Sequence, residues 1–519
     1  MLINAKTKYS LFRELQFDKI SESSTNRIFW YFAIGYCILW TSVPILTQPN
    51  APLDTIEMLY WGNEWELGYY KHPPLPAWLA KFAYTLGGNS IWITYFLSQL
   101  CIFACFIAVF KVGKQTVGNQ ISLLNLIILQ TCYYYNLTSP EFNNNVTSRA
   151  FGALSVLFLY QGIRKYSARD WILAGIFLGL GALCKYDIVI LAVLMITFSV
   201  GHPYGRASWK TPGPFLLSAA ALIIFLPHMY WLWNNDFPTI DYFLKRSNHE
   251  RTLLSHLSNP VLFLFSQIPA ILPVFILILF LTGRRWHWEQ INSKSQLFSR
   301  DFLCYFGFGP IIVVFLIGVI SGANFRSMWG SSLWTFSSLA LLSSVQLRLS
   351  PLAIRKTVYC GLMFAVFFLS ILIFRNSILP HFQEHGSRIH FPGQQLSIYV
   401  RNLYISEVGK EPVVVGGPWW EAANVACYGS HQLSVYADLN SVISPWMSDR
   451  EMKQKGGVIV WNSEFYEEYL IDVKKRFPSA TIYPPIRLSW QNEALHSSLK
   501  FRVAVVKPTN LESSNYQHP

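Results

Sequence analysis

The sequence predicts an all-α polytopic membrane domain followed by a C-terminal extracytoplasmic α/β domain. Of the 519 residues, 52% are hydrophobic and only 13% are charged. Apolar runs of about 20 residues, the length that a helix needs to cross a bilayer, recur up to residue 375. Beyond that point the sequence becomes more polar and carries short β-like runs.

Roughly eleven transmembrane helices are expected in the membrane domain, residues 28–375. Their ranges are 28–47, 91–110, 120–137, 147–162, 171–184, 186–200, 214–233, 260–282, 302–320, 329–345 and 356–374. Residues 1–27 are basic and contain no small-residue cleavage site. We therefore interpret them as a cytoplasmic tail before an uncleaved first span.

The distribution of Lys and Arg predicts the orientation. These residues concentrate in the tail and in alternate loops, which the positive-inside rule places in the cytoplasm. The chain is thus expected to be a multi-pass protein of the plasma (inner) membrane, with the loop 48–90 and the C-terminal domain on the periplasmic side. The net charge of +13 does not indicate a nucleic-acid partner, because no basic cluster accompanies a nucleic-acid-binding motif.

Residues 376–519 are expected to form a small soluble α/β domain. The runs PVVVGG, GGVIVW and FRVAVVK are typical of buried strands, and EFYEEYLIDVKKRF is typical of a helix. Gly416 and Gly417 are similar to a phosphate-binding turn, but the fingerprint is incomplete. A turn that ends a strand is the favoured interpretation.

The first outer loop contains the stretch LDTIEMLYWGNEWELGYYKHPPLPAWLAKF. Asp54 and Glu57 are three residues apart, so one helical turn would place both carboxylates on the same face. They could equally belong to a solvated loop. The nearby rings suit the lipid headgroup layer, where aromatic side chains are half wet; they are Trp61, Trp65, Tyr69, Tyr70 and Trp78.

Two prolines follow the aromatic run. Pro73 and Pro74 cannot continue a helix and would turn the chain at a fixed angle. Lys71 and His72 would then lie at the boundary between water and lipid, where a lipid phosphate sits.

Two further cations are candidates for phosphate binding. Lys185 lies between two apolar segments, and a lysine in lipid is costly unless it is paired or faces water. Snorkelling to the interface or pairing with Asp187 would also explain it. Arg326 begins a later span on the outer side, where it could bind phosphate or serve as an interfacial anchor.

The motif of the first outer loop resembles a known family. DTIEMLYWGNEWELGYYKHPPLPAWLA, with its early acid, aromatic run and HPPL, resembles the bacterial glycosyltransferase family 39 group. That group is similar to the protein O-mannosyltransferases and the lipid A aminoarabinose transferases, all of the GT-C fold. WILAGIFLGLGALCKY resembles the glycine-rich span of that family, which ends in lysine. The similarity of layout extends over nearly the whole chain.

The resemblance implies an inverting glycosyltransferase that acts on the extracytoplasmic side. The donor would be a hexosyl or pentosyl group on a polyprenyl phosphate, and the acceptor a lipid, a polysaccharide or a protein. Asp54 would be the general base that deprotonates the acceptor hydroxyl, assisted by Glu57. The residues expected to bind the donor phosphate are Lys71, His72, Lys185 and Arg326.

The chain departs from the GT-C pattern in the next outer loop, SPEFNNNVTSR. Where a second acid often stands, this loop offers Glu141 followed by three asparagines. The amides could hydrogen-bond sugar hydroxyls or phosphate oxygens. The expected substrate-binding residues are thus Tyr70, Glu141, Asn143 and Asn145. The sequence does not establish a cofactor, and use of a divalent metal cation is left open, with Asp54, Glu57 and His249 as candidate ligands.

Two other classes of function fit part of the pattern. A lipid-linked sugar transporter or flippase would also place charges beside lipid, but transporters usually show repeated halves and broken helices near mid-membrane. A non-enzymatic envelope scaffold would not need the acid, HPPL and lysine together.

Overall fold

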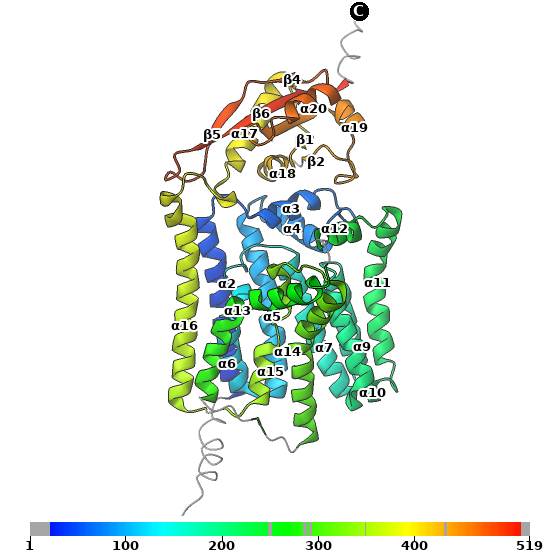
Figure 1. Ribbon diagram of the computed structural model, residues 1–519, viewed down its shortest axis with the longest axis vertical. Helices are drawn as coiled ribbons and strands as arrows, with labels where there is room; N and C mark the ends of the chain where they lie inside the picture. The colour runs from blue at the N-terminus through cyan, green and yellow to red at the C-terminus, as the bar shows by residue number, and fades with distance from the viewer. Residues whose placement is uncertain are drawn as a thin grey trace, which may run out of the picture.

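A helical bundle carries a small sheet domain at one end, and three short helices lie between the two (Figure 1). The structure is a computed structural model that describes residues 21–247, 252–283, 288–289, 293–347, 349–429 and 433–509. It confirms a mostly helical protein with a C-terminal sheet domain. The limits 28–375 and 376–519 remain predictions.

The bundle contains long helices and several shorter ones. They are α2 (Glu22–Thr47), α5 (Trp92–Thr116), α6 (Asn119–Leu129), α7 (Asn144–Lys165), α8 (Ala168–Ala182), α9 (Ile188–Gly201), α10 (Pro203–Ser208), α11 (Gly213–Asn234), α13 (Ser255–Thr282), α14 (Lys294–Ser321), α15 (Ser337–Ser344) and α16 (Pro351–Ile373). Within the described ranges, six helical segments are long and apolar enough to cross a membrane: α2, α5, α11, α13, α14 and the run Pro351–Phe382. Each of the other predicted spans overlaps a shorter or less apolar helix, so the number of eleven crossings stays a prediction.

The three short helices lie between the bundle and the sheet domain: α3 (Leu53–Gly62), α4 (Leu75–Leu86) and α12 (Pro238–Ser247) (Figure 1). Prolines set where α3 and α4 begin, because Pro52 and Pro74 occupy their N-cap positions and cannot donate a backbone hydrogen bond. The backbone N–H of Leu75 donates to the carbonyl of Leu183 over 3.0 Å. The HPPL segment is therefore fixed to the end of α8, just before Lys185.

Among its described residues, the sheet domain contains six strands and four helices. In chain order they are α17 (Gly393–Val408), β1 (Val414–Gly417), α18 (Trp419–Tyr428), β2 (Ser434–Ala437), α19 (Asp449–Lys455), β3 (Gly457–Asn462), α20 (Tyr469–Arg476), β4 (Thr481–Ile482), β5 (Ile486–Ser489) and β6 (Ser498–Val506). The strand order is β2-β1-β3-β6-β4, with β5 also paired to β6. Strands β2, β1 and β3 are parallel, whereas β6 is antiparallel to β3. The predicted runs coincide with β1, β3, β6 and α20.

One apolar core joins the sheet domain to α3 and α4. It includes Ile56 and Ala77 from the short helices and Val415 and Val460 from the sheet. Directed hydrogen bonds fix the same interface: the Tyr84 hydroxyl donates to the carbonyl of Cys427 over 2.6 Å, and the Ser434 hydroxyl to Glu64 over 2.6 Å. The two parts are therefore held in one orientation, and residues of the sheet domain lie above α3.

The expected placement of the loop aromatics in the headgroup layer is wrong for two of them. Trp61 and Tyr69 are fully buried and stack on each other at 5.0 Å between ring centroids. The Tyr69 hydroxyl donates to the carbonyl of Trp61 over 2.7 Å. They form part of the core because the sheet domain covers this loop, a contact that the local sequence does not reveal.

A side chain at Gly62 would separate α3 from α4. A Cβ at this position would lie 2.4 Å from the carbonyl oxygen of Ala77, whereas a Cβ at Gly35 on α2 would meet nothing within 4 Å. We expect Gly62→Ala to destabilise the full-length protein by about 1–3 kcal/mol through overpacking. Gly35→Ala should be neutral or stabilise by up to ~1 kcal/mol. Thermal unfolding in detergent measures both, and equal melting temperatures for the two variants would contradict this packing.

Candidate active site

Asp54 lies in the first turn of α3 and faces the start of α7. Its side chain is half-buried, and Nδ2 of Asn143 donates to its Oδ2 over 3.2 Å. Glu141 accepts a hydrogen bond of 2.9 Å from the backbone N–H of Asp54. This N–H is one of the donors that a helix start leaves unpaired. Two neighbouring residues of the second outer loop therefore fix both the backbone and the carboxylate of Asp54.

The three consecutive asparagines each make a different structural contact. Asn143 Oδ1 accepts from two backbone N–H groups in the first turn of α7, at 3.0 and 3.2 Å, and so caps that helix. Asn144 donates to the carbonyl of Cys184 over 2.8 Å. Asn145 Oδ1 accepts from Lys185 Nζ over 2.8 Å. The start of α7 thereby connects Asp54 on one side with Lys185 on the other.

The second carboxylate of α3 forms an ion pair. Glu57 is buried, and its Oε1 lies 2.5 Å from Lys71 Nζ. The same ammonium lies 5.1 Å from the ring centroid of Tyr70, 5.8 Å from that of Tyr242 and 5.0 Å from that of Trp419. The outer loop, α12 and the sheet domain thus meet around this one charge.

Burial and mutual repulsion shift the pKa values of the carboxyl groups upward. Burial raises the pKa of Asp54, and the Lys71 charge is the largest influence that opposes the rise. Burial raises the pKa of Glu57 as well, again opposed by Lys71. Burial and the Asp54 charge together raise the pKa of Glu141 to about 8. With their pKa values shifted in this way, Asp54, Glu57 and Glu141 resemble the carboxyl groups of an acid–base catalytic site more than surface carboxylates.

Cations surround His72, the residue before the two prolines. Burial, followed by the charges of Lys185, Lys71 and Arg246 in that order, lowers its pKa to about 3. His72 is therefore neutral at physiological pH. The three cations come from the outer loop, the α8–α9 turn and α12, and their field favours an anion at this point.

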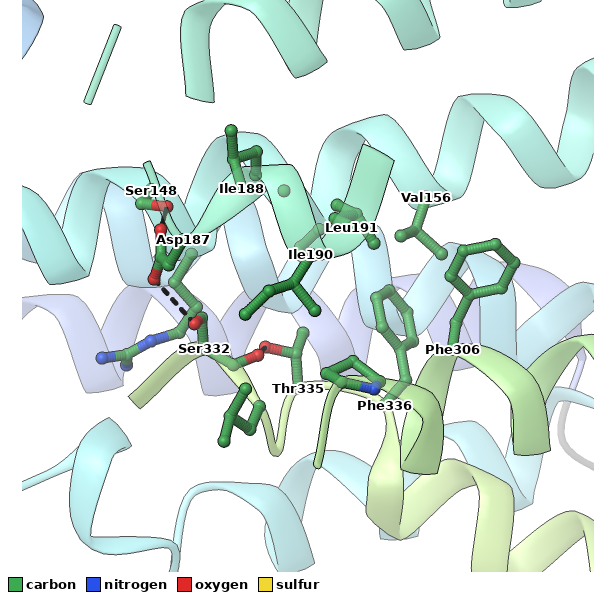
Figure 2. Close-up of a pocket in the computed structure, with 15 residues that line it drawn as sticks. Ser148, Val156, Asp187, Ile188, Ile190, Leu191, Phe306, Ser332, Thr335 and Phe336 are labelled. Carbon is green, nitrogen blue, oxygen red and sulfur yellow. Dashed lines mark hydrogen bonds between the residues drawn. The ribbon is translucent and has the colours of Figure 1, made fainter. Parts of the chain in front are cut away.

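Asp187, the ion-pair partner of Lys185, lines a cavity inside the bundle. Lys185 Nζ lies 3.4 Å from Asp187, whose two carboxylate oxygens accept from the hydroxyls of Ser148 at 2.8 Å and Ser332 at 2.9 Å. The cavity has a volume of about 50 Å³. Figure 2 shows Ser148, Asp187 and Ser332 at one end of it and apolar side chains such as Phe306 at the other. A polar end beside Lys185 thus continues into an apolar interior.

The remaining predicted residues differ in how they relate to this group. The expected pairing of Lys185 with Asp187 is present, alongside the bond to Asn145. Arg326 is exposed before the short 3-10 helix Ser327–Ser332, and in the described ranges no hydrogen bond or ion pair links its guanidinium to the residues above. His249 lies outside the described residues. No three His, Cys, Asp or Glu side chains gather as a metal site within the part of the chain that the structure describes.

Several residues at the site carry no signal in the sequence. Tyr242 and Trp419 contact Lys71 from α12 and from the sheet domain. Trp419 is far from the outer loop along the chain, so only the docking of the sheet domain brings it here. The three successive asparagines were a visible signal, but their partners were not.

Comparisons with known proteins show a shared fold and a resemblance in sequence. The family described as dolichyl-phosphate-mannose-protein mannosyltransferase matches residues 71–231. A crystal structure of ArnT from Cupriavidus metallidurans bound to undecaprenyl phosphate superposes over 94% of this chain and 99% of that chain, with a TM-score of 0.63 and 11% sequence identity. This chain has the GT-C fold. The resemblance to GT-C membrane glycosyltransferases is therefore confirmed.

Relatives of this GT-C protein include curated enzymes of Rhizobium johnstonii. The lipopolysaccharide core galacturonosyltransferase RgtB is 26% identical over 234 residues, which cover 42% of this chain and 46% of the relative. The lipid A galacturonosyltransferase RgtD is 25% identical over 195 residues, which cover 36% of this chain and 40% of the relative. The matched region spans less than half the length of these relatives.

Proposed function

We propose that the protein is an inverting glycosyltransferase of the plasma membrane. It transfers a sugar from a polyprenyl-phosphate-linked donor to an acceptor on the extracytoplasmic side. The observation that carries the proposal is the link from Asp54 through Asn143 and Asn145 to Lys185, with distances of 3.2 Å at one end and 2.8 Å at the other. A carboxylate that can accept a proton is thereby held next to cations that can hold a phosphate.

The donor phosphate binds where the three cations surround His72. Lys71, Lys185 and Arg246 supply the positive field, and neutral His72 supplies a hydrogen-bonding ring. ArnT, which shares the fold, has been crystallised with undecaprenyl phosphate. The apolar end of the cavity lined by Asp187 is suited to part of a prenyl chain, because side chains such as Leu191 and Phe306 offer contacts to hydrocarbon there.

The transfer is a single displacement at the anomeric carbon. Asp54 takes the proton of the acceptor hydroxyl, and the resulting oxygen nucleophile attacks that carbon from the face opposite the phosphate. The bond between the anomeric carbon and the phosphate oxygen breaks with inversion. Polyprenyl phosphate leaves with the bonding electrons, and Lys71 and Lys185 stabilise its added charge. Glu57 acts indirectly, because it holds Lys71 in position.

Among the possible acceptors, the comparisons favour an envelope glycolipid over a polysaccharide or a protein. RgtB and RgtD are named for transfer to lipopolysaccharide core and to lipid A. The positive-inside rule, applied to the basic loops, supports an extracytoplasmic location for the sheet domain and α3. A flippase is disfavoured, because the ionic groups described above lie at the end of the bundle that carries the sheet domain (Figure 1).

Replacement of the proposed base tests the enzyme assignment directly. In cells that lack the gene, complementation with Asp54→Asn should leave the envelope glycolipids without the sugar that the wild-type protein adds, with a rate loss of about 100-fold or more. Mass spectrometry of the glycolipids measures the transfer. Asp241→Asn is the matched control, because Asp241 is an exposed carboxylate on α12 that pairs with Lys245. Full transfer by Asp54→Asn, at wild-type abundance in the membrane, would contradict the proposal.

The pH dependence of transfer should respond to the charge at residue 71. Asp54 accepts a proton only when it is ionised, so activity falls as the pH drops through its pKa. Lys71 is the largest charge that lowers this pKa, and Arg246 contributes less. Lys71→Gln should therefore move the acidic limb of the kcat/KM profile to higher pH, and Arg246→Gln should move it less in the same direction. An unchanged limb, or a shift to lower pH, would argue against Asp54 as the base.

A further inference from the structure

The carboxyl edge of the parallel strands faces α3. Gly417, Ala437 and Asn462 end β1, β2 and β3, which run in the same direction. In open α/β sheets this edge is where ligands usually bind. Here Trp419, in the first turn after β1, is one of the three aromatic side chains around the Lys71 ammonium. The carboxyl edge of the sheet therefore borders the candidate active site on the side opposite the bundle.

The backbone at this edge adopts unusual conformations. Asp438 and Leu439 have φ values of 53° and 49°, a region that residues other than glycine adopt at a cost. Gly417 has φ of 133°, and a Cβ there would lie 2.0 Å from the carbonyl oxygen of Val460. As a result Asp438 turns back across the start of α18, where its Oδ1 accepts from the N–H of Trp419 over 3.0 Å.

A second carboxyl group at the edge is buried with one of its oxygens unpaired. Glu421, in the first turn of α18, is 4% exposed, and its Oε2 has no hydrogen-bond partner among the described residues. Burial, with a smaller contribution from the charge of Asp438, raises its pKa to about 8. Such an atom normally has a protein, water or ligand partner, because burying it unsatisfied costs about 1–3 kcal/mol.

Aromatic side chains lie at the same edge as the carboxyl groups of Asp438 and Glu421. Trp419 and Trp420 are half-buried, and the Arg388 guanidinium lies 5.9 Å from the ring centroid of Trp420. Tyr466 is also half-buried. Its backbone N–H donates to the carbonyl of Asn462, the last residue of β3, over 3.0 Å, so Tyr466 lies at the same edge of the sheet. Burial raises its pKa, and the charges of Glu421 and Asp438 raise it further.

We propose that Glu421, Asp438, Trp419, Trp420 and Tyr466 form a saccharide-binding subsite for the sugar part of the acceptor. Carboxyl and phenol groups exchange hydrogen bonds with sugar hydroxyls, and tryptophan faces pack against sugar C–H groups. The inference rests on the proposed function. The lipid-linked donor reaches Asp54 from the bundle, and the acceptor sugar reaches it from the sheet domain.

Direct binding of a lipid-free saccharide tests the subsite. The probe is delipidated lipopolysaccharide core oligosaccharide, titrated by calorimetry into the full-length protein in nanodiscs. Asp438→Asn tolerates the left-handed backbone and keeps the oxygen that accepts from Trp419, and Tyr466→Phe removes only a hydroxyl. We expect each variant to weaken binding about tenfold. Glu493→Gln, an exposed carboxyl change on the same domain, should bind as the wild type does.

Two results would overturn the inference: no heat of binding to the wild-type protein, or equal affinities for the wild type, Asp438→Asn and Tyr466→Phe. Unchanged melting temperatures for these conservative variants exclude unfolding as the cause of a loss. The Asp54→Asn protein separates this inference from the proposed function. It should bind the oligosaccharide normally while transfer is lost. If the Asp54→Asn protein still transfers sugar, the proposed function is wrong. If saccharide binding does not change when residues 438 and 466 are replaced, only the proposed subsite is wrong.

Discussion

The Asn143 side-chain amide holds the proposed site together, because its oxygen and its nitrogen form hydrogen bonds with two different parts of the protein. Its oxygen caps α7, and its nitrogen donates to the Asp54 carboxylate. A helix that belongs to the bundle thereby fixes a carboxylate that belongs to the outer loop. Since Lys185 bonds to Asn145 on the first turn of the same helix, the start of α7 sets the spacing between the proposed base and the proposed phosphate ligand.

The buried charges around Asp54 can be explained only together, because each one offsets the cost of burying another. Glu57 is buried, which would be costly for an isolated carboxylate, but Lys71 pairs with it and is itself enclosed by three rings. Burial alone would lower the pKa of Lys71, yet the Glu57 charge raises it overall. The ammonium therefore remains charged beside Asp54. An anionic leaving group that enters this field meets cations whose positions are already fixed, which is how a preorganised site stabilises charge.

Much of the architecture was predictable, because it depends on local patterns. Apolar length indicated the helices of the bundle, and β-branched runs indicated β1, β3 and β6. Asp54 and Glu57 were predictable from the resemblance of the first loop to a known family, Lys71 from the prolines beside it, and Lys185 because a lysine in lipid is costly. The burial of Trp61 was not predictable, because the sheet domain that covers it lies hundreds of residues away along the chain. The sequence predicts Asn143 and Asn145 as substrate-binding residues; in the structure they contact Asp54 and Lys185, and Asn144 contacts Cys184. Contacts between segments that are far apart along the chain produce no periodic pattern in the sequence, so they could not be predicted from it.

The central claim is that Asp54 and Lys185 face the same lipid-linked phosphate. A cryo-electron microscopy structure of the full-length protein in nanodiscs with undecaprenyl phosphate tests it most directly. We expect the phosphate beside His72, within hydrogen-bonding distance of Lys185 Nζ, with the Asp54 carboxylate open to the same space. A phosphate bound at the opposite end of the bundle, or one walled off from Asp54 by the intervening loop, would contradict the claim.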